Sequence, residues 1–72
     1  MSKHDENLAS AAAAAELIRA ARTLIDRATS QLRSVETHPA EVALLRPDMD
    51  RVDHHLRAVE HLVYHLLGKL KR

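Results

Sequence analysis

The chain has 72 residues, with eleven Lys and Arg, ten Asp and Glu, six histidines and no cysteine. A chain of this length forms at most one small domain, and its folded monomer buries only about 60% of the surface that the unfolded chain exposes. Without cysteine it has no disulfides, thiolate metal sites or cysteine nucleophiles. A formal net charge of +1 and a single aromatic residue, Tyr64, argue against nucleic-acid binding.

The sequence predicts neither a signal peptide nor a membrane span. Residues 2–7 are polar and acidic, whereas a signal peptide starts basic and continues into an apolar core. The longest apolar runs, 11–15 and 42–45, are much shorter than the roughly 20 residues that cross a bilayer. We therefore expect a cytoplasmic protein.

A first helix is predicted over residues 7–37, after a polar lead-in over 1–6. Asp5 is expected to cap it, with Glu6 in its first turn. The alanine run 11–15 favours a helix, because alanine has the highest helix propensity. Apolar residues then recur at spacings of three and four, which is typical of one helical face. They are Ala11, Ala14, Ile18, Ala21, Ile25, Ala28, Leu32 and Val35.

A second helix is predicted over residues 39–71. Because a residue before proline avoids the α conformation, Pro39 predicts that the first helix ends near Glu36 or Thr37. Pro47 leaves two alternatives: one helix kinked at this residue, or a short helix over 40–46 followed by another from 47. The apolar pattern keeps its register across Pro47, which favours the single kinked helix.

The second helix carries a heptad pattern at Val52, Leu56, Val59, Val63, Leu66 and Leu70, and Leu62 and Leu67 widen it. A short connection between two helices of similar length predicts an all-α fold, an antiparallel αα-hairpin. The apolar arc of the second helix is wider than one neighbouring helix covers. We therefore expect two hairpins to pair as a homodimeric four-helix bundle.

The residues expected to carry this self-association belong to both helices. They are Leu17, Ile18, Leu24, Ile25, Leu32, Val52, Leu56, Val59, Leu62, Val63, Leu66, Leu67 and Leu70. In length and small-and-large layering the hairpin resembles the small plasmid copy-control bundle proteins. The resemblance covers architecture alone and implies no function.

His54, His61 and His65 are expected on the helix face opposite the heptad pattern. His61 and His65 are one turn apart, so both imidazoles can bind one Zn²⁺, Ni²⁺ or Cu²⁺ ion. Asp50 and His54 form a second pair with the same spacing. A complete site needs three or four ligands, so the others must come from another chain. The alternatives for this face are plain solvation and contact with a larger protein partner.

The sequence does not predict an enzyme. It has no glycine-rich phosphate loop, and the glutamate of the His-Glu-x-x-His protease motif is absent between His61 and His65. Glu60 and His61 are adjacent, whereas di-iron bundles use Glu-x-x-His on inward faces. We expect a non-catalytic, self-associating module for interaction, scaffolding or regulation. The alternative is a transition-metal binder for sensing, buffering or metal-driven assembly.

Overall fold

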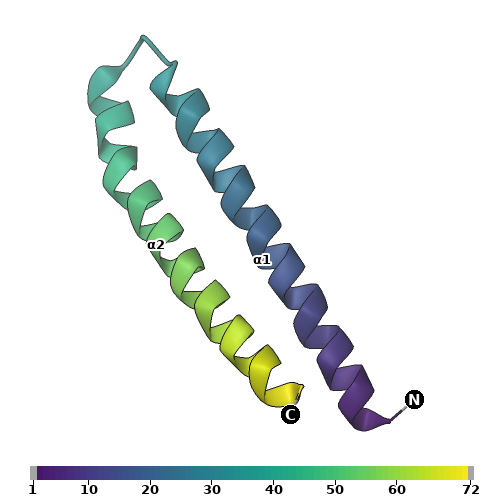
Figure 1. Ribbon diagram of the computed structural model, residues 1–72. Helices are drawn as coiled ribbons and strands as arrows, with labels where there is room; N and C mark the ends of the chain where they lie inside the picture. Colours follow the sequence, from purple (N-terminus) through teal and green to yellow (C-terminus); the bar gives the residue numbers. More distant parts are fainter. Residues whose placement is uncertain (1, 72) are drawn as a thin grey trace.

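The computed structural model describes residues 2–71 and is an antiparallel helical hairpin (Figure 1). Helix α1 spans Lys3–Arg33 and helix α2 spans Pro39–Leu70. The two lie side by side along their length and give a rod of 55 × 17 × 12 Å. The predicted αα-hairpin is confirmed. Within residues 2–71, neither helix contains an apolar stretch long enough to cross a membrane.

Helix α1 begins four residues before the predicted start at residue 7. Its N-cap is Ser2, whose side-chain oxygen accepts a hydrogen bond from the backbone N–H of Asp5 at 3.2 Å. The prediction that Asp5 caps the helix is therefore wrong. Asp5 and Glu6 instead lie within the first turn, where a negative charge is favourable beside the free N–H groups.

Helix α1 also ends four residues before the predicted end at residue 37. Its last turn tightens, because the N–H groups of Ser34 and Val35 bond to carbonyls three residues back. His38 then adopts a left-handed conformation, with φ 54° and ψ 52°, and directs the chain into α2. The residue before Pro39 thus avoids the right-handed helical region, as expected.

Helix α2 begins at Pro39, as predicted, ends at Leu70, and continues through Pro47 as one ribbon (Figure 1). The alternative of two separate helices is therefore wrong. Proline has no N–H to donate to the carbonyl four residues earlier, which belongs to Ala43. Val42 and Met49, which lie seven residues apart on either side of Pro47, are both half-buried, so the helix keeps one register across the proline.

The best-buried part of the molecule lies at the open end of the hairpin. Leu67 of α2 packs against Ala11 and Ala15 of α1, and these three residues are the buried ones among residues 2–71. Leu8, Val63 and Leu70 surround them. Small residues on one helix opposite a large residue on the other let the two backbones approach closely.

The residues of each helix that face the other form a line along the helix, which we call the contact line. That of α2 is rotated relative to the predicted heptad pattern. Leu56, Val63 and Leu70 face α1, but Val52, Val59 and Leu66 are exposed. The remaining inward positions include Met49, Leu67 and two acidic residues, Asp53 and Glu60. The most apolar line of α2 is therefore not the one that packs within the hairpin. Of the two inward acids, Glu60 pairs with Arg22 of α1 and Asp53 pairs with Arg57 of α2 itself.

Candidate functional site

Arg22 of α1 and Glu60 of α2 form an ion pair between the helices. Arg22 Nη1 lies 2.6 Å from Glu60 Oε1, and the side chains are only 27% and 15% exposed. A charge-assisted bond of this length, shielded from water, fixes how the helices slide and rotate against each other. Arg22 Nε is also buried and has no hydrogen-bond partner among the described residues.

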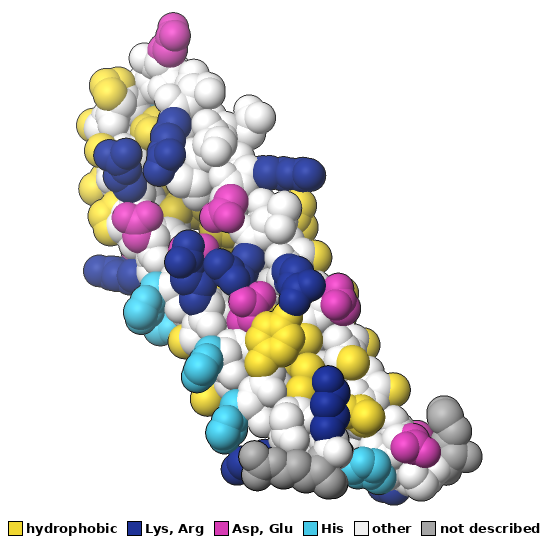
Figure 2. Space-filling model, viewed as in Figure 1, with side chains coloured by type: hydrophobic (Ala, Val, Ile, Leu, Met, Phe, Trp, Pro, Cys, Tyr) yellow, Lys and Arg dark blue, Asp and Glu magenta, His cyan; other side chains and the backbone are white. Residues whose placement is uncertain are grey.

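Arg19 and Tyr64 make a second contact between the helices, one turn from the first. Arg19 Nη2 donates a hydrogen bond to the Tyr64 hydroxyl, and the guanidinium carbon lies 5.8 Å from the ring centroid. This bond raises the pKa of Arg19, and the charges of Tyr64 and Glu16 act in the same direction. Together with the Arg22–Glu60 pair, this contact defines a charged surface across both helices, which we call the polar face. Figure 2 shows basic and acidic side chains interleaved over the middle of the hairpin.

Ile18 and Val63 lie on the contact line, and the residues next to them in the sequence lie on two opposite sides of the hairpin. Both are half-buried between the helices. The residues that directly follow them are Arg19 and Tyr64, which lie on the polar face and contact each other. Successive residues of an α-helix point about 100° apart, so the residues that directly precede the contact line lie on the opposite side of the hairpin.

Several residues on that opposite side are large and apolar. Leu17 directly precedes Ile18 and is 71% exposed, and Leu62 directly precedes Val63 and is 64% exposed. The same relation holds for Leu24 before Ile25 and for Leu66 before Leu67. Val52 and Val59 lie between these positions and the contact line. We call this surface the apolar face, and it consists of Leu17, Leu24, Val52, Val59, Leu62 and Leu66.

The structure thus divides the thirteen residues predicted for self-association into two groups. Seven are buried or half-buried within the hairpin: Ile18, Ile25, Leu32, Leu56, Val63, Leu67 and Leu70. The other six are the apolar face, and all of them are exposed. The first group holds the two helices of one chain together. The second group is available to bind something else.

The exposed area of the hairpin is large for its mass. A compact monomer of 8.1 kDa exposes about 4,500 Å², whereas this chain exposes 5799 Å². The difference, about 1,300 Å², exceeds the roughly 800 Å² that each partner buries in a standard protein interface.

The histidines proposed as metal ligands all lie on α2 and are exposed. His61 and His65 are one helical turn apart, as are Asp50 and His54. Figure 2 shows histidine side chains spaced along the α2 edge of the hairpin. Within residues 2–71, no three His, Asp or Glu side chains lie close enough to hold one ion. That His61 and His65, or Asp50 and His54, bind a metal ion stays a prediction.

Sequence reasoning missed the contacts of the polar face. Arg22, Glu60 and Tyr64 have ordinary helical spacing, and no motif marks them. The available signal was a charged residue at two positions inside apolar periodicity: Arg22 is four residues after Ile18, and Glu60 is four residues after Leu56. Opposite charges on the inward lines of two antiparallel helices indicate a pair.

Comparison of the chain with protein-family models, curated proteins and solved structures gives no match.

Proposed function

We propose that the hairpin pairs with a second copy through the apolar face and forms an antiparallel four-helix bundle. The bundle then acts as a non-catalytic scaffold or interaction module. The observation that carries this proposal is the placement of six exposed Leu and Val side chains on one side of both helices, while the Arg22–Glu60 and Arg19–Tyr64 contacts lie on the other side. Such a two-sided rod buries its apolar side best against an identical surface.

The exposed area of the whole chain leaves room for a stable pair. The excess exposed area of the chain is larger than one side of a standard interface. Alanines at positions 13, 20 and 28 flank Leu17 and Leu24 on α1, whereas α2 presents larger side chains. A small-residue helix facing a large-residue helix lets two hairpins interlock. The polar face stays on the outside of this bundle and remains available to further partners.

The test is the molar mass of two single variants measured by light scattering. Leu62→Lys places a charge in the centre of the proposed interface, so it should reduce the mass from twice 8.1 kDa to 8.1 kDa. The helical circular dichroism should remain, because Leu62 is exposed within the hairpin. The matched control is Thr23→Lys, which adds the same charge at an exposed position outside the apolar face. A Leu62→Lys variant with the wild-type mass would overturn the proposal.

Transition-metal binding is the second candidate, and the exposure of both His61 and His65 favours it. Their turn lies away from the apolar face, so it stays accessible in the proposed bundle. Two imidazoles from each of two bundles would supply the four ligands that a tetrahedral Zn²⁺ site takes. The metal would then join bundles into larger assemblies.

The metal hypothesis is tested by measuring the molar mass with excess Zn²⁺ and again after EDTA. Binding predicts an increase in mass that EDTA reverses and that His65→Ala abolishes. His4→Ala is the control, because His4 lies in the first turn of α1, far along the chain from the pair. An unchanged mass and melting temperature with Zn²⁺ would exclude this role.

A further inference from the structure

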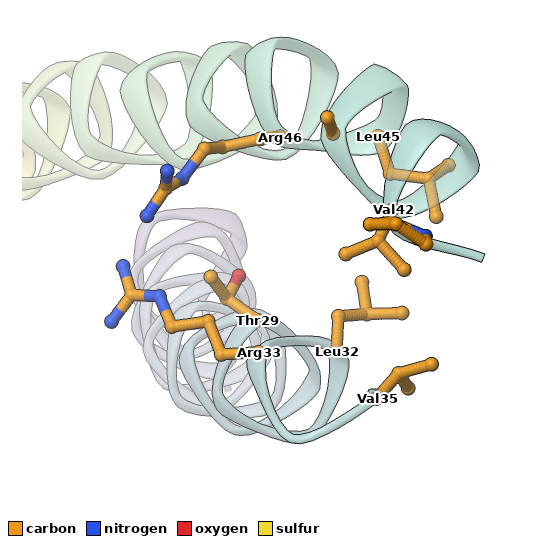
Figure 3. A pocket seen from close by; sticks show the side chains of 9 residues that line it. Thr29, Leu32, Arg33, Val35, Val42, Leu45 and Arg46 are labelled. Atoms are coloured by element: carbon orange, nitrogen blue, oxygen red, sulfur yellow. The ribbon is translucent and has the colours of Figure 1, made fainter. Parts of the chain in front are cut away.

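The loop end of the hairpin contains a pocket that neither function above uses. It lies between the last turns of α1 and the first turns of α2, and its volume is about 290 Å³. Small-molecule pockets begin at about 300 Å³, so this one suits a small ligand. Figure 3 shows the lining side chains directed into the space between the helices.

The pocket has an apolar side and a basic side. Leu32 of α1 and Val42 and Leu45 of α2 line one side, while Arg33 of α1 and Arg46 of α2 line the other. Figure 3 shows the two guanidinium groups turned toward each other across the opening. An apolar wall beside two convergent cations matches a ligand with an apolar body and an anionic end.

Arg33 and Arg46 differ from four other arginines of the hairpin. Arg19, Arg22, Arg51 and Arg57 each have a carboxylate oxygen within 4.0 Å. Over residues 2–71, no such ion pair involves Arg33 or Arg46. Two like charges that converge without a carboxylate between them repel each other, and a bound anion removes this repulsion.

Thr29 lies at the boundary between the two sides (Figure 3). Its hydroxyl already donates to the carbonyl of Ile25 at 2.9 Å, so it has no proton for an anion. The donors available in the pocket are therefore the two guanidinium groups. Guanidinium pairs with carboxylate oxygens in a planar, two-bond geometry, which makes a carboxylate the best-matched anion.

We propose that this pocket binds a small amphipathic carboxylate. Its carboxylate lies between Arg33 and Arg46, and its apolar body packs against Leu32, Val42 and Leu45. The volume limits the body to a medium-length alkyl chain or a single ring. The pocket shares no residue with the apolar face as defined above, so different variants test the two proposals.

Arg33 has one competing environment. It also lines a neighbouring hollow on the polar face together with Asp26, Asp50 and Asp53. If Arg33 turned toward these carboxylates in solution, the pocket would lose one of its two cations. The experiment therefore tests the two arginines separately.

The test is a titration of the full chain with octanoate, followed by the amide NMR signals. Saturable shifts are expected in residues 29–33 and 42–46. Octanol lacks the charge and should bind at least about 10-fold more weakly, because it loses the charge-assisted hydrogen bonds to the arginines. Acetate lacks the apolar body and should also bind at least about 10-fold more weakly, because it buries no methylene groups.

Arg46→Gln and Arg33→Gln should each weaken octanoate binding about 10-fold. The control Arg27→Gln removes an exposed arginine elsewhere on α1 and should leave binding unchanged. Ala43→Leu keeps a strong helix former and fills the pocket, so it should reduce binding while the melting temperature stays the same. Equal affinity for octanol, unchanged affinity in both arginine variants, or shifts confined to the apolar face would overturn the proposal.

Discussion

Arg22 Nη1 and Glu60 Oε1 lie 2.6 Å apart, in the half-buried seam between the two helices. The pair occupies a place where an apolar contact would otherwise continue the packing of Ile18 and Val63. Because both charges are shielded, each one needs the other. The Arg22–Glu60 pair therefore sets the rotation of the helices and decides which apolar residues lie inside the hairpin.

Removing one member of this pair should destabilise the hairpin. Glu60→Ala leaves the Arg22 guanidinium shielded and unpaired, and we expect a loss of about 1–3 kcal/mol in the free energy of unfolding. Arg51→Ala breaks the exposed Arg51–Asp48 pair and should cost less than about 0.5 kcal/mol. Urea unfolding at one fixed protein concentration measures both values.

The double variant Arg22→Met with Glu60→Leu removes both charges. It therefore shows whether the loss of stability in Glu60→Ala comes from the unpaired charge of Arg22 or from the absence of the ion pair. Apolar residues of similar size fill the seam without an unpaired charge, so stability should return to within about 1 kcal/mol of the wild type. A double variant as unstable as Glu60→Ala would contradict this account of the Arg22–Glu60 pair.

Leu66 and Leu67 are neighbours with different surroundings. Leu67 is 8% exposed against the alanines of α1, whereas Leu66 is 47% exposed on the apolar face. Leu67→Ala should cost about 2–4 kcal/mol, because it leaves a cavity in the hairpin itself. At a concentration low enough to keep the chain monomeric, Leu66→Ala should cost less than about 1 kcal/mol. Equal losses by urea unfolding would mean that the contact line is the predicted heptad pattern after all.

Pro47 is the weakest point in the backbone of α2. Proline in a helix interior is about 3 kcal/mol less favourable than alanine, and Pro47 leaves the Ala43 carbonyl without its helical donor. Pro47→Ala should raise the free energy of unfolding by about 1–3 kcal/mol, read as a higher melting temperature by circular dichroism. A lower melting temperature would show that closing the loop end requires this proline.

His38 holds the left-handed conformation that joins the helices. This conformation costs a non-glycine residue about 1–2 kcal/mol, while glycine adopts it freely at a smaller entropic cost. His38→Gly should therefore stabilise the chain by about 0.5–1 kcal/mol. His38→Val should destabilise it by at least about 1 kcal/mol, because a branched side chain tolerates positive φ poorly. Thermal unfolding that ranked these two variants in the reverse order would contradict the role given to His38.

The helices, their loop and the continuity through Pro47 followed from propensity, periodicity and proline stereochemistry. The ends of α1 did not, because Ser2 and Ser34 act through local hydrogen bonds that leave no periodic signal. The contact line between the helices did not follow from the sequence either. The apolar arc of α2 is wider than one neighbour covers, so hydrophobicity alone does not say which half faces α1. The Arg22–Glu60 pair makes that choice, and it needs both helices to be in place.

The most direct test of the central claim is the molar mass of the wild-type chain by light scattering, over a range of concentrations at neutral pH. Pairing through the apolar face predicts twice 8.1 kDa, falling toward 8.1 kDa only on strong dilution. A mass of 8.1 kDa at every concentration would contradict it.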